Sequence, residues 1–153
     1  MDLIKVGDIA PDFSLRDNNG NKVSLSDFKG KKVLLSWHPL AWTGVCMDQM
    51  RSLENNWDEF QKLNTVPLGL SVDPPPSKKA WAFVILLENV KILSDFWPHG
   101  KTAIEYGVFI EKAGISQRAN IIIDEEGIVK WVKAYPIDQL PDIKEVIQEI
   151  SKM

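Results

Sequence analysis

The chain reads KVLLSW over residues 32–37 and HPLAWTGVC over residues 38–46, and these two runs decide the fold that we expect. The first run is short, apolar and rich in branched and aromatic side chains, which is typical of a strand buried on both faces. Beyond it, apolar residues recur at steps of three and four and predict one stripe on a long helix: Met50, Leu53, Trp57, Phe60 and Leu63. Cys46 therefore lies where a buried strand ends and a helix begins, a common place for a site in an α/β sheet.

Cys46 is the only cysteine in the 153 residues. A thiol reacts as its thiolate, and the unpaired N–H groups and partial positive charge of a helix N-terminus favour that form. Thr43 lies three residues earlier and can face the same side of the first turn. Pro39 restrains the loop and removes one backbone donor. A lone cysteine elsewhere in a chain is more often a small buried hydrophobe, but this loop favours a reactive one.

The pattern Pro39-x-x-x-Thr43-x-x-Cys46 resembles the active-site motif of the peroxiredoxins, thiol peroxidases of the AhpC/TSA superfamily. Further blocks resemble the same family in the same order: residues 6–15, 93–100, 103–107 and 118–124. The run VDPPP at residues 72–76, together with residues 95–100, is most similar to the one-cysteine alkyl hydroperoxide reductase E group. The resemblance implies an α/β, thioredoxin-like fold with an N-terminal β-hairpin extension and a central mixed β-sheet flanked by helices. Residues 6–15 would form the opening strand.

Local patterns predict the remaining elements. Residues 12–15 and 22–25 are typical of a β-hairpin with Asn19-Gly20 as its turn, and residues 26–28 of a short capped helical turn. Four other apolar runs favour strands: residues 68–72, 92–93, 119–123 and 128–132. Three segments favour helices: residues 77–87, with Ser77 as the cap, residues 98–106 and residues 141–150. A loop is expected around residues 112–114. We find no repeat or linker and predict one domain over residues 1–153.

Composition limits the classes of function. With 44% hydrophobic and 25% charged residues, the chain suits a globular domain with a sizeable core. A net charge of −3 gives no general attraction to nucleic acid or to an anionic membrane, and no stretch approaches the roughly 18 apolar residues of a membrane span. Residues 1–5 lack the features of a signal peptide, so we expect a cytoplasmic protein. No phosphate-binding or zinc motif occurs, and we expect no metal, haem or flavin.

Three further residues are assigned through the resemblance. In the family, an arginine at the position of Arg118 approaches the reactive cysteine, although an arginine beside a run of isoleucines is more often an edge or interface residue. Gln49 matches a position whose glutamate or glutamine orients that arginine. His38 replaces the usual Phe or Tyr, and its effect on the thiolate depends on its protonation. A metal site formed by His38 and Cys46 would lack further ligands.

The implied reaction is attack of the Cys46 thiolate on a peroxide oxygen, which releases water or an alcohol and leaves a sulfenic acid. Donors aimed at both oxygens stabilise the transition state, and we expect them from the Arg118 side chain, the Val45 and Cys46 N–H groups and the Thr43 hydroxyl. Without a second cysteine, the sulfenic acid needs an external thiol: a glutaredoxin-like protein, thioredoxin or a small thiol. Hydrogen peroxide and organic hydroperoxides are the expected substrates, and a homodimer is the expected assembly.

Two other functions stay open at this point. Cys46 oxidation could switch a binding surface in a redox sensor or holdase, or the chain could be a catalytically silent thioredoxin-fold scaffold. A sensor is oxidised once and stops, whereas a peroxidase turns over with an added thiol. The presence of Pro39, Thr43, Cys46 and Arg118 together favours the peroxidase.

Overall fold

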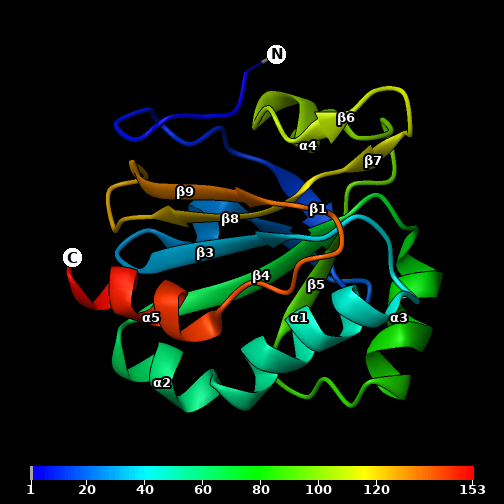
Figure 1. The fold of residues 1–153 in the computed structure, drawn as a ribbon, viewed down its shortest axis with the longest axis horizontal. Helices are drawn as coiled ribbons and strands as arrows, with labels where there is room; N and C mark the ends of the chain where they lie inside the picture. Colours follow the sequence, from blue (N-terminus) through cyan, green and yellow to red (C-terminus); the bar gives the residue numbers. More distant parts are fainter. Residues whose placement is uncertain (1) are drawn as a thin grey trace.

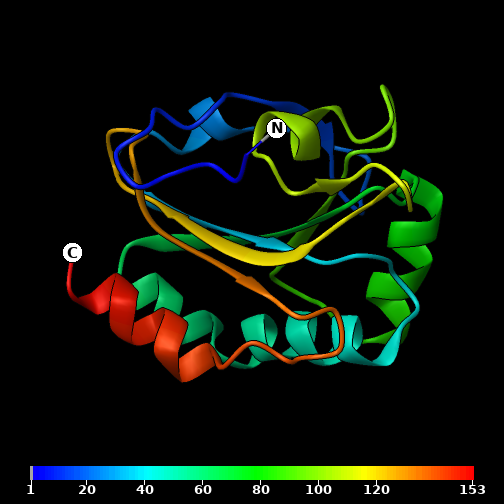
Figure 2. The same cartoon turned by 45° about the horizontal axis from the view of Figure 1, so that its top comes forward.

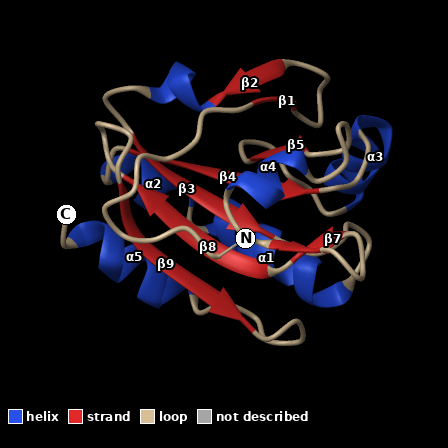
Figure 3. Ribbon diagram, turned by 90° about the horizontal axis from the view of Figure 1, so that it is seen from above, coloured by secondary structure: helices blue, strands red, loops and turns tan. Residues whose placement is uncertain are grey.

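The computed structural model describes residues 2–153; Met1, the first residue of the segment in which we expect no signal peptide, lies outside them. Seven strands form one mixed sheet in the order β2-β1-β5-β4-β3-β8-β9 (Figures 1 and 3). Strand β3 (Lys32–Trp37) is parallel to β4 (Thr65–Ser71) and antiparallel to β8 (Arg118–Ile123). The predicted α/β fold with a central mixed sheet is confirmed.

Helices cover both faces of this sheet. Their bounds are η1 (Leu25–Phe28, a 3-10 helix), α1 (Gly44–Asn55), α2 (Trp57–Lys62), α3 (Pro75–Val84), α4 (Lys101–Glu105) and α5 (Ile143–Ser151). Figure 2 shows α1, α2 and α5 on one side of the sheet, and α4 with the N-terminal segment on the other. No helix among residues 2–153 is long and apolar enough to span a bilayer.

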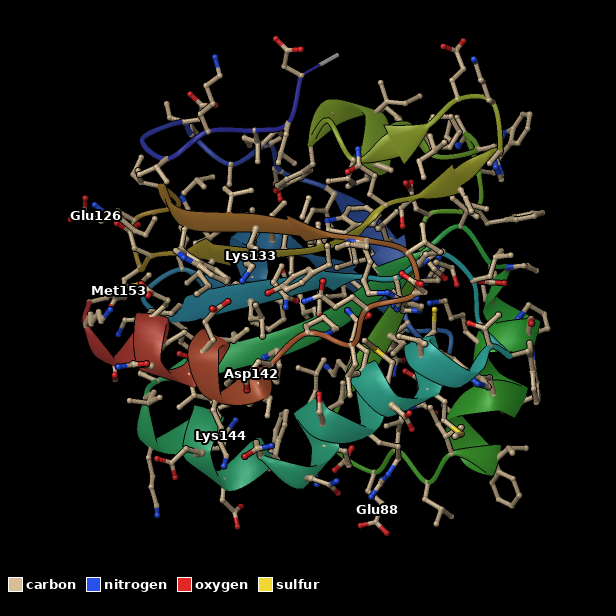
Figure 4. All side chains as sticks on the ribbon, viewed as in Figure 1. Glu88, Glu126, Lys133, Asp142, Lys144 and Met153 are labelled. Carbon is tan, nitrogen blue, oxygen red and sulfur yellow. The ribbon has the colours of Figure 1, made fainter. Side chains whose placement is uncertain are left out.

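Each face of the central strands has its own apolar core, which explains why residues 33–37 carry no polar stripe. Leu35 and Trp37 of β3 belong to one cluster, which includes Tyr106 at the end of α4. Leu34 belongs to the other cluster, which includes Cys46 of α1. Most charged side chains lie at the periphery, as Figure 4 shows for the labelled exposed residues Glu88, Glu126 and Lys144. Cys46, a residue of α1, is thus part of an apolar core.

The predicted N-terminal hairpin forms between β1 (Ser14–Arg16) and β2 (Lys22–Ser24), which are antiparallel. Gly20 in its turn has a φ of +81°, a conformation that favours glycine. Strand β1 also pairs with β5 (Lys91–Ser94). The expected opening strand over residues 6–15 is wrong except at Ser14 and Leu15, because an isolated bridge from Ile9 to Ile128 is the one strand-like pairing before them among the described residues. A φ of +96° at Gly7 turns the chain there.

The single long helix expected after Cys46 is also wrong. Asn56, with φ −109° and ψ 17°, separates α1 from α2, and its side-chain amide donates to the Ser52 carbonyl. Asparagine competes with helical backbone hydrogen bonds in this way. The apolar stripe survives the break, because Leu53 on α1 and Phe60 on α2 are both buried.

Other boundaries differ for local reasons. Helix α3 begins at Pro75 rather than at Ser77, because proline suits the first helical position. Helix α4 begins only after Gly100, whose φ of +71° is left-handed. The loop at residues 112–114 joins two short strands that we did not predict, β6 (Phe109–Ile110) and β7 (Ile115–Ser116). Two-residue strands carry too little pattern to be recognised. Strand β9 (Val129–Tyr135) completes the second predicted hairpin with β8.

Gly69 in β4 sets how closely α1 approaches the sheet. A Cβ at this position would lie 2.4 Å from Met50 Sδ and 2.8 Å from Ile92 Cγ2, and the β-branched Ile92 has little rotamer freedom. We expect Gly69→Ala to lower the free energy of unfolding by about 1–3 kcal/mol, measured by urea denaturation. Gly44→Ala is the matched control, because its Cβ meets nothing within 4 Å. Equal stability of the two variants would contradict this close packing.

Candidate active site

The sheet register brings Arg118 to the end of β3, just before the Cys46 loop. Trp37, the last residue of β3, pairs with Ala119 of the antiparallel β8, so Arg118 lies one step beyond. The chain then crosses to α1, whose first turn contains Cys46. Both side chains are buried, and Arg118 Nη1 lies 3.3 Å from Cys46 Sγ. Two residues 72 apart in the chain therefore make one site.

Hydrogen bonds fix the guanidinium group of Arg118 on two sides. Its Nε and Nη2 atoms donate to the Ile137 carbonyl at 3.0 and 2.7 Å. Its Nη1 atom also donates to Gln49 Oε1 at 2.7 Å. A guanidinium held by this many acceptors loses most of its rotational freedom. The Nη1 atom is thereby oriented toward the sulfur of Cys46.

Gln49 is itself held by the end of β3. Its side-chain nitrogen donates to Ser36 Oγ at 2.7 Å and to the Trp37 carbonyl at 3.1 Å. Since the nitrogen has two acceptors, the amide oxygen faces Arg118. Gln49 thus links α1, β3 and β8 at the site, and we propose that it orients the arginine. Ser36 and the Ile137 carbonyl carry no chemical motif, and the sequence did not point to them.

The charge of Arg118 is balanced by the sulfur rather than by a carboxylate. No carboxylate among residues 2–153 lies within 4.0 Å of this guanidinium. A buried cation without an anion carries a large desolvation cost, which a neighbouring thiolate reduces. The geometry therefore suits a nucleophilic Cys46.

The first turn of α1 presents free donors beside the sulfur. Thr43 is the N-cap residue, but its side chain makes no capping hydrogen bond; its hydroxyl donates to the Leu40 carbonyl at 2.9 Å. Met47 is the first residue whose N–H bonds back into the helix, to the Thr43 carbonyl. The N–H groups of Val45 and Cys46 therefore have no intrahelical acceptor. They are available to an anion or a peroxide.

The loop before α1 is fastened to the segment after β4. Pro39 is buried within it, and the Asp73 carboxylate accepts hydrogen bonds from the Ala41 N–H and from a serine hydroxyl at the end of β4. Trp42 has a φ of +69°, and its indole N–H donates to Ser77 Oγ at 3.0 Å. These contacts hold a backbone conformation that few residues other than glycine adopt. Asp73 and Ser77 were not among the predicted site residues.

His38 and Lys78 form a second buried pair next to the site. Neither side chain is exposed, and Lys78 Nζ lies 2.9 Å from His38 Nε2. Burial lowers the pKa of His38 well below its usual range, and the Lys78 and Arg118 charges add to this while the Ser36 backbone opposes it. His38 is therefore neutral at neutral pH. Among residues 2–153, no group of three or more His, Cys, Asp or Glu side chains could hold a metal ion.

Lys78 has an unusual pKa for a lysine. Burial lowers it from 10.5 to about 7, while the charges of Asp73 and Cys46 oppose the shift. Sequence reasoning did not find this residue, because two adjacent lysines at the start of a helix are typical of an exposed face. Only the position of Lys78 on α3, facing the loop that follows β3, shows that it is buried.

A thioredoxin-like sheet that carries a buried cysteine at a helix N-terminus beside an arginine defines a thiol-based redox protein. The model of the AhpC/TSA family matches residues 6–132, and the chain belongs to this family. Alkyl hydroperoxide reductase E of Mycobacterium tuberculosis (strain ATCC 25618 / H37Rv) is 42% identical over 132 residues, which cover 86% of each chain. Peroxiredoxin Bcp of Escherichia coli (strain K12) is 36% identical over 138 residues, again covering 86% of each.

Solved structures agree with the fold. Reduced 2-Cys peroxiredoxin of Plasmodium vivax has a TM-score of 0.87 and 29% identity, covering 95% of this chain and 80% of its own. AhpC of Enterococcus faecalis has a TM-score of 0.90 at 24% identity, covering 99% and 92%. The predicted peroxiredoxin family and thioredoxin-like fold are confirmed, and the single Cys46 fits the one-cysteine type.

The lowered pKa of Lys78 predicts a pH-dependent stability. Between pH 7 and about 10.4 the unfolded chain binds a proton that the folded protein does not, so the free energy of unfolding rises with pH. The slope is roughly 1.4 kcal/mol per pH unit. From pH 7 to pH 9, wild type should gain about 2 kcal/mol relative to Lys78→Met in urea denaturation. Lys79→Met, which removes an exposed lysine, should follow wild type. A constant difference between wild type and Lys78→Met would contradict this pKa.

Proposed function

We propose that this protein is a one-cysteine peroxiredoxin that reduces hydrogen peroxide and organic hydroperoxides through Cys46, in the cytoplasm. The observation that carries the proposal is the 3.3 Å contact between Arg118 Nη1 and Cys46 Sγ, in a buried site where no carboxylate among residues 2–153 lies within 4.0 Å of the guanidinium. Family membership and the two curated relatives support it. The hydroperoxide substrate named for the mycobacterial relative is the substrate class that we extend to this chain.

In the reaction, the Cys46 thiolate attacks one peroxide oxygen along the O–O bond. The S–O bond forms, the O–O bond breaks, and the departing oxygen takes a proton to leave as water or alcohol. Charge moves from sulfur to the departing oxygen, so donors aimed along this line stabilise the transition state more than the ground state. Arg118 and the N–H groups of Val45 and Cys46 supply them. The Thr43 hydroxyl, held by the Leu40 carbonyl, has lone pairs free to accept from the peroxide.

The second half-reaction uses an external thiol. Cys46 is the only cysteine, so its sulfenic acid has no partner in the chain. Attack by a glutaredoxin-like protein, thioredoxin or a small thiol forms a mixed disulfide, and a second thiol then restores Cys46. Cys46 is fully buried, whereas Thr43 and Gly44 are exposed. A bulky thiol therefore reaches the sulfur only when the first turn of α1 opens.

Removal of the arginine charge tests the role of Arg118. Arg118→Met should slow the loss of the Cys46 thiol with hydrogen peroxide by roughly a hundredfold, the usual effect of one lost transition-state donor. Stopped-flow tryptophan fluorescence beside a thiol assay measures the rate. Arg16→Met, on the distant hairpin, should react like wild type, and Cys46→Ser should not react. An Arg118→Met variant as fast as wild type would refute the proposed role.

The same reagents separate the peroxidase from the redox sensor or holdase. With dithiothreitol and excess peroxide, a peroxidase consumes many equivalents per chain. A sensor consumes one equivalent and stops. If Cys46 reacts no faster than a free small thiol, the peroxidase proposal fails.

We also propose a homodimer formed through the face around the active-site loop. The loops at residues 38–43, 72–74 and 95–100 follow β3, β4 and β5, whose carboxyl ends lie at one edge of the sheet. Four exposed apolar side chains lie in two of these loops: Leu40, Trp42, Phe96 and Trp97. Exposed aromatic residues gathered at one edge are typical of interfaces.

A charge in this surface should weaken the dimer. Trp97 is 80% exposed, so Trp97→Glu leaves the fold intact and places a carboxylate in the proposed interface. Light scattering should give twice the 17.3 kDa chain mass for wild type and a lower mass for Trp97→Glu at the same concentration. Ile9→Glu, 78% exposed at the opposite end of β8, should stay dimeric. A wild type that is monomeric, or a Trp97→Glu variant as dimeric as wild type, contradicts the proposed interface.

A further inference from the structure

Lys78 and His38 have no part in the peroxidase mechanism described above, yet both are fully buried next to it. The Lys78 ammonium carries three N–H donors, and its one hydrogen-bond partner among residues 2–153 is His38 Nε2 at 2.9 Å. The Trp81 ring lies against both groups, 6.0 Å from Lys78 Nζ and 5.4 Å from the His38 ring. A lysine with so few partners is an expensive group to bury.

The hydrogen bond between the two side chains restricts their protonation. An ammonium group only donates, so a protonated Lys78 requires His38 Nε2 to be unprotonated. The imidazole proton then lies on Nδ1, which is buried and has no partner that meets hydrogen-bond geometry among the described residues. The pair therefore holds one positive charge at most, and that charge belongs to Lys78.

Charged and titratable groups face Lys78 from three other elements. His38, which follows β3, contacts Lys78; the charges of Asp73, which follows β4, and of Cys46 on α1 raise the pKa of Lys78, and the charge of Arg118 on β8 lowers the pKa of His38. The Asp73 carboxylate is occupied by the Ala41 N–H and a serine hydroxyl, and no carboxylate in the part of the chain that the structure describes lies within 4.0 Å of the Lys78 amine. Of the groups that favour the ammonium form, only Cys46 changes its charge during a redox reaction.

We propose that Lys78, held by His38, is a second buried cation of the Cys46 site, and that it gives up its proton when the thiolate is oxidised to the uncharged sulfenic acid. This inference rests on the proposed peroxidase function. Lys78 acts here as a positioning residue for charge, because it touches His38 rather than the sulfur. The thiolate favours the ammonium, and the loss of the thiolate favours the free amine.

The protons and electrons balance. The thiolate and hydrogen peroxide give the sulfenic acid and hydroxide; sulfur loses two electrons to the breaking O–O bond. The hydroxide then takes a proton to form water. Where Lys78 is protonated, it passes from ammonium to amine and supplies that proton through solvent, so the oxidation step takes less than one proton from the buffer. Lys78 regains the proton when the thiolate is restored.

The reciprocal coupling is measurable without any peroxide. In lysine labelled with carbon-13, the Cε shift of Lys78, assigned through its own backbone amide, reports its protonation. We expect a midpoint near pH 7 in the reduced wild type. In Cys46→Ser the midpoint should fall by about half a unit or more, because the thiolate is gone. The proposal would be overturned by equal Lys78 midpoints in the two proteins, or by a Lys78 midpoint as high as those of the exposed lysines.

Proton uptake tests the redox step itself. The reduced protein is mixed with one equivalent of hydrogen peroxide in a weak buffer at pH 7, and the protons that it takes up are measured. The loss of ultraviolet absorbance gives the amount of thiolate consumed, and the result is expressed as protons taken up per thiolate consumed. Wild type should take up between about a half and three quarters of a proton, because Lys78 is about half protonated there and a midpoint that falls by half a unit or more releases about a quarter to a half of a proton. The variant His38→Phe/Lys78→Met removes both partners of the buried hydrogen bond, which keeps the fold, and should take up about one. The control Lys79→Met should match wild type.

The outcomes separate the two proposals. If Cys46 reacts slowly with peroxide but the Lys78 midpoint differs between wild type and Cys46→Ser, the peroxidase function is refuted and the charge coupling is supported. If Cys46 reacts fast with peroxide but the Lys78 midpoints of wild type and Cys46→Ser are equal, the coupling is refuted and the peroxidase function is supported. The same conclusion follows if every variant takes up one proton per thiolate consumed.

Discussion

The contact between Arg118 and Cys46 depends on one antiparallel register. Because β8 runs beside β3 with Ala119 opposite Trp37, the first residue of β8 reaches the point where β3 gives way to the Cys46 loop. A slip of one residue would turn the Arg118 side chain to the opposite face of the sheet, toward the apolar cluster around Tyr106 and away from Cys46. Ile121 and Ile123 fill the cluster around Tyr106 and Ile122 fills the cluster around Cys46, so apolar packing holds β8 on both faces. The apolar core of β8 thus positions the charge.

A site with two buried cations needs a framework that does not relax around them. Gln49 is part of this framework, because it connects Arg118 to the end of β3, and Asp73 ties the preceding loop to the end of β4. Neither residue neutralises a charge by direct ion pairing among residues 2–153. Gln49 keeps Arg118 beside the Cys46 sulfur, and Asp73 holds the loop that leads into the first turn of α1. The electrostatics of the site therefore depend on hydrogen bonds that fix these groups in place.

Local patterns were enough for the longer strands and for the place of Cys46, since a buried strand and an amphipathic helix each leave a periodicity within a few residues, whereas the two-residue strands β6 and β7 do not. Arg118 was placed only through the family resemblance, because its partner lies 72 residues away and no local pattern encodes a register. Lys78 was missed for a related reason. Its side chain is buried because α3 faces the loop after β3, and the local sequence of two adjacent lysines does not indicate this burial. The expected long helix is interrupted at Asn56, whose side chain donates a hydrogen bond to the Ser52 carbonyl, although the apolar stripe continues beyond it.

Burial of Lys78 opposes stability at neutral pH. A cation with one neutral partner is worse for folding than a pair of apolar side chains of similar volume, so the pair of His38 and Lys78 weakens the core that it occupies. Arg118 differs, because it has the Ile137 carbonyl, Gln49 and the sulfur as partners. The destabilising pair lies within the electrostatic reach of the one side chain whose charge disappears on oxidation. A charge that is costly to hold is also one that a small change nearby can release, which makes Lys78 suited to respond to the state of Cys46.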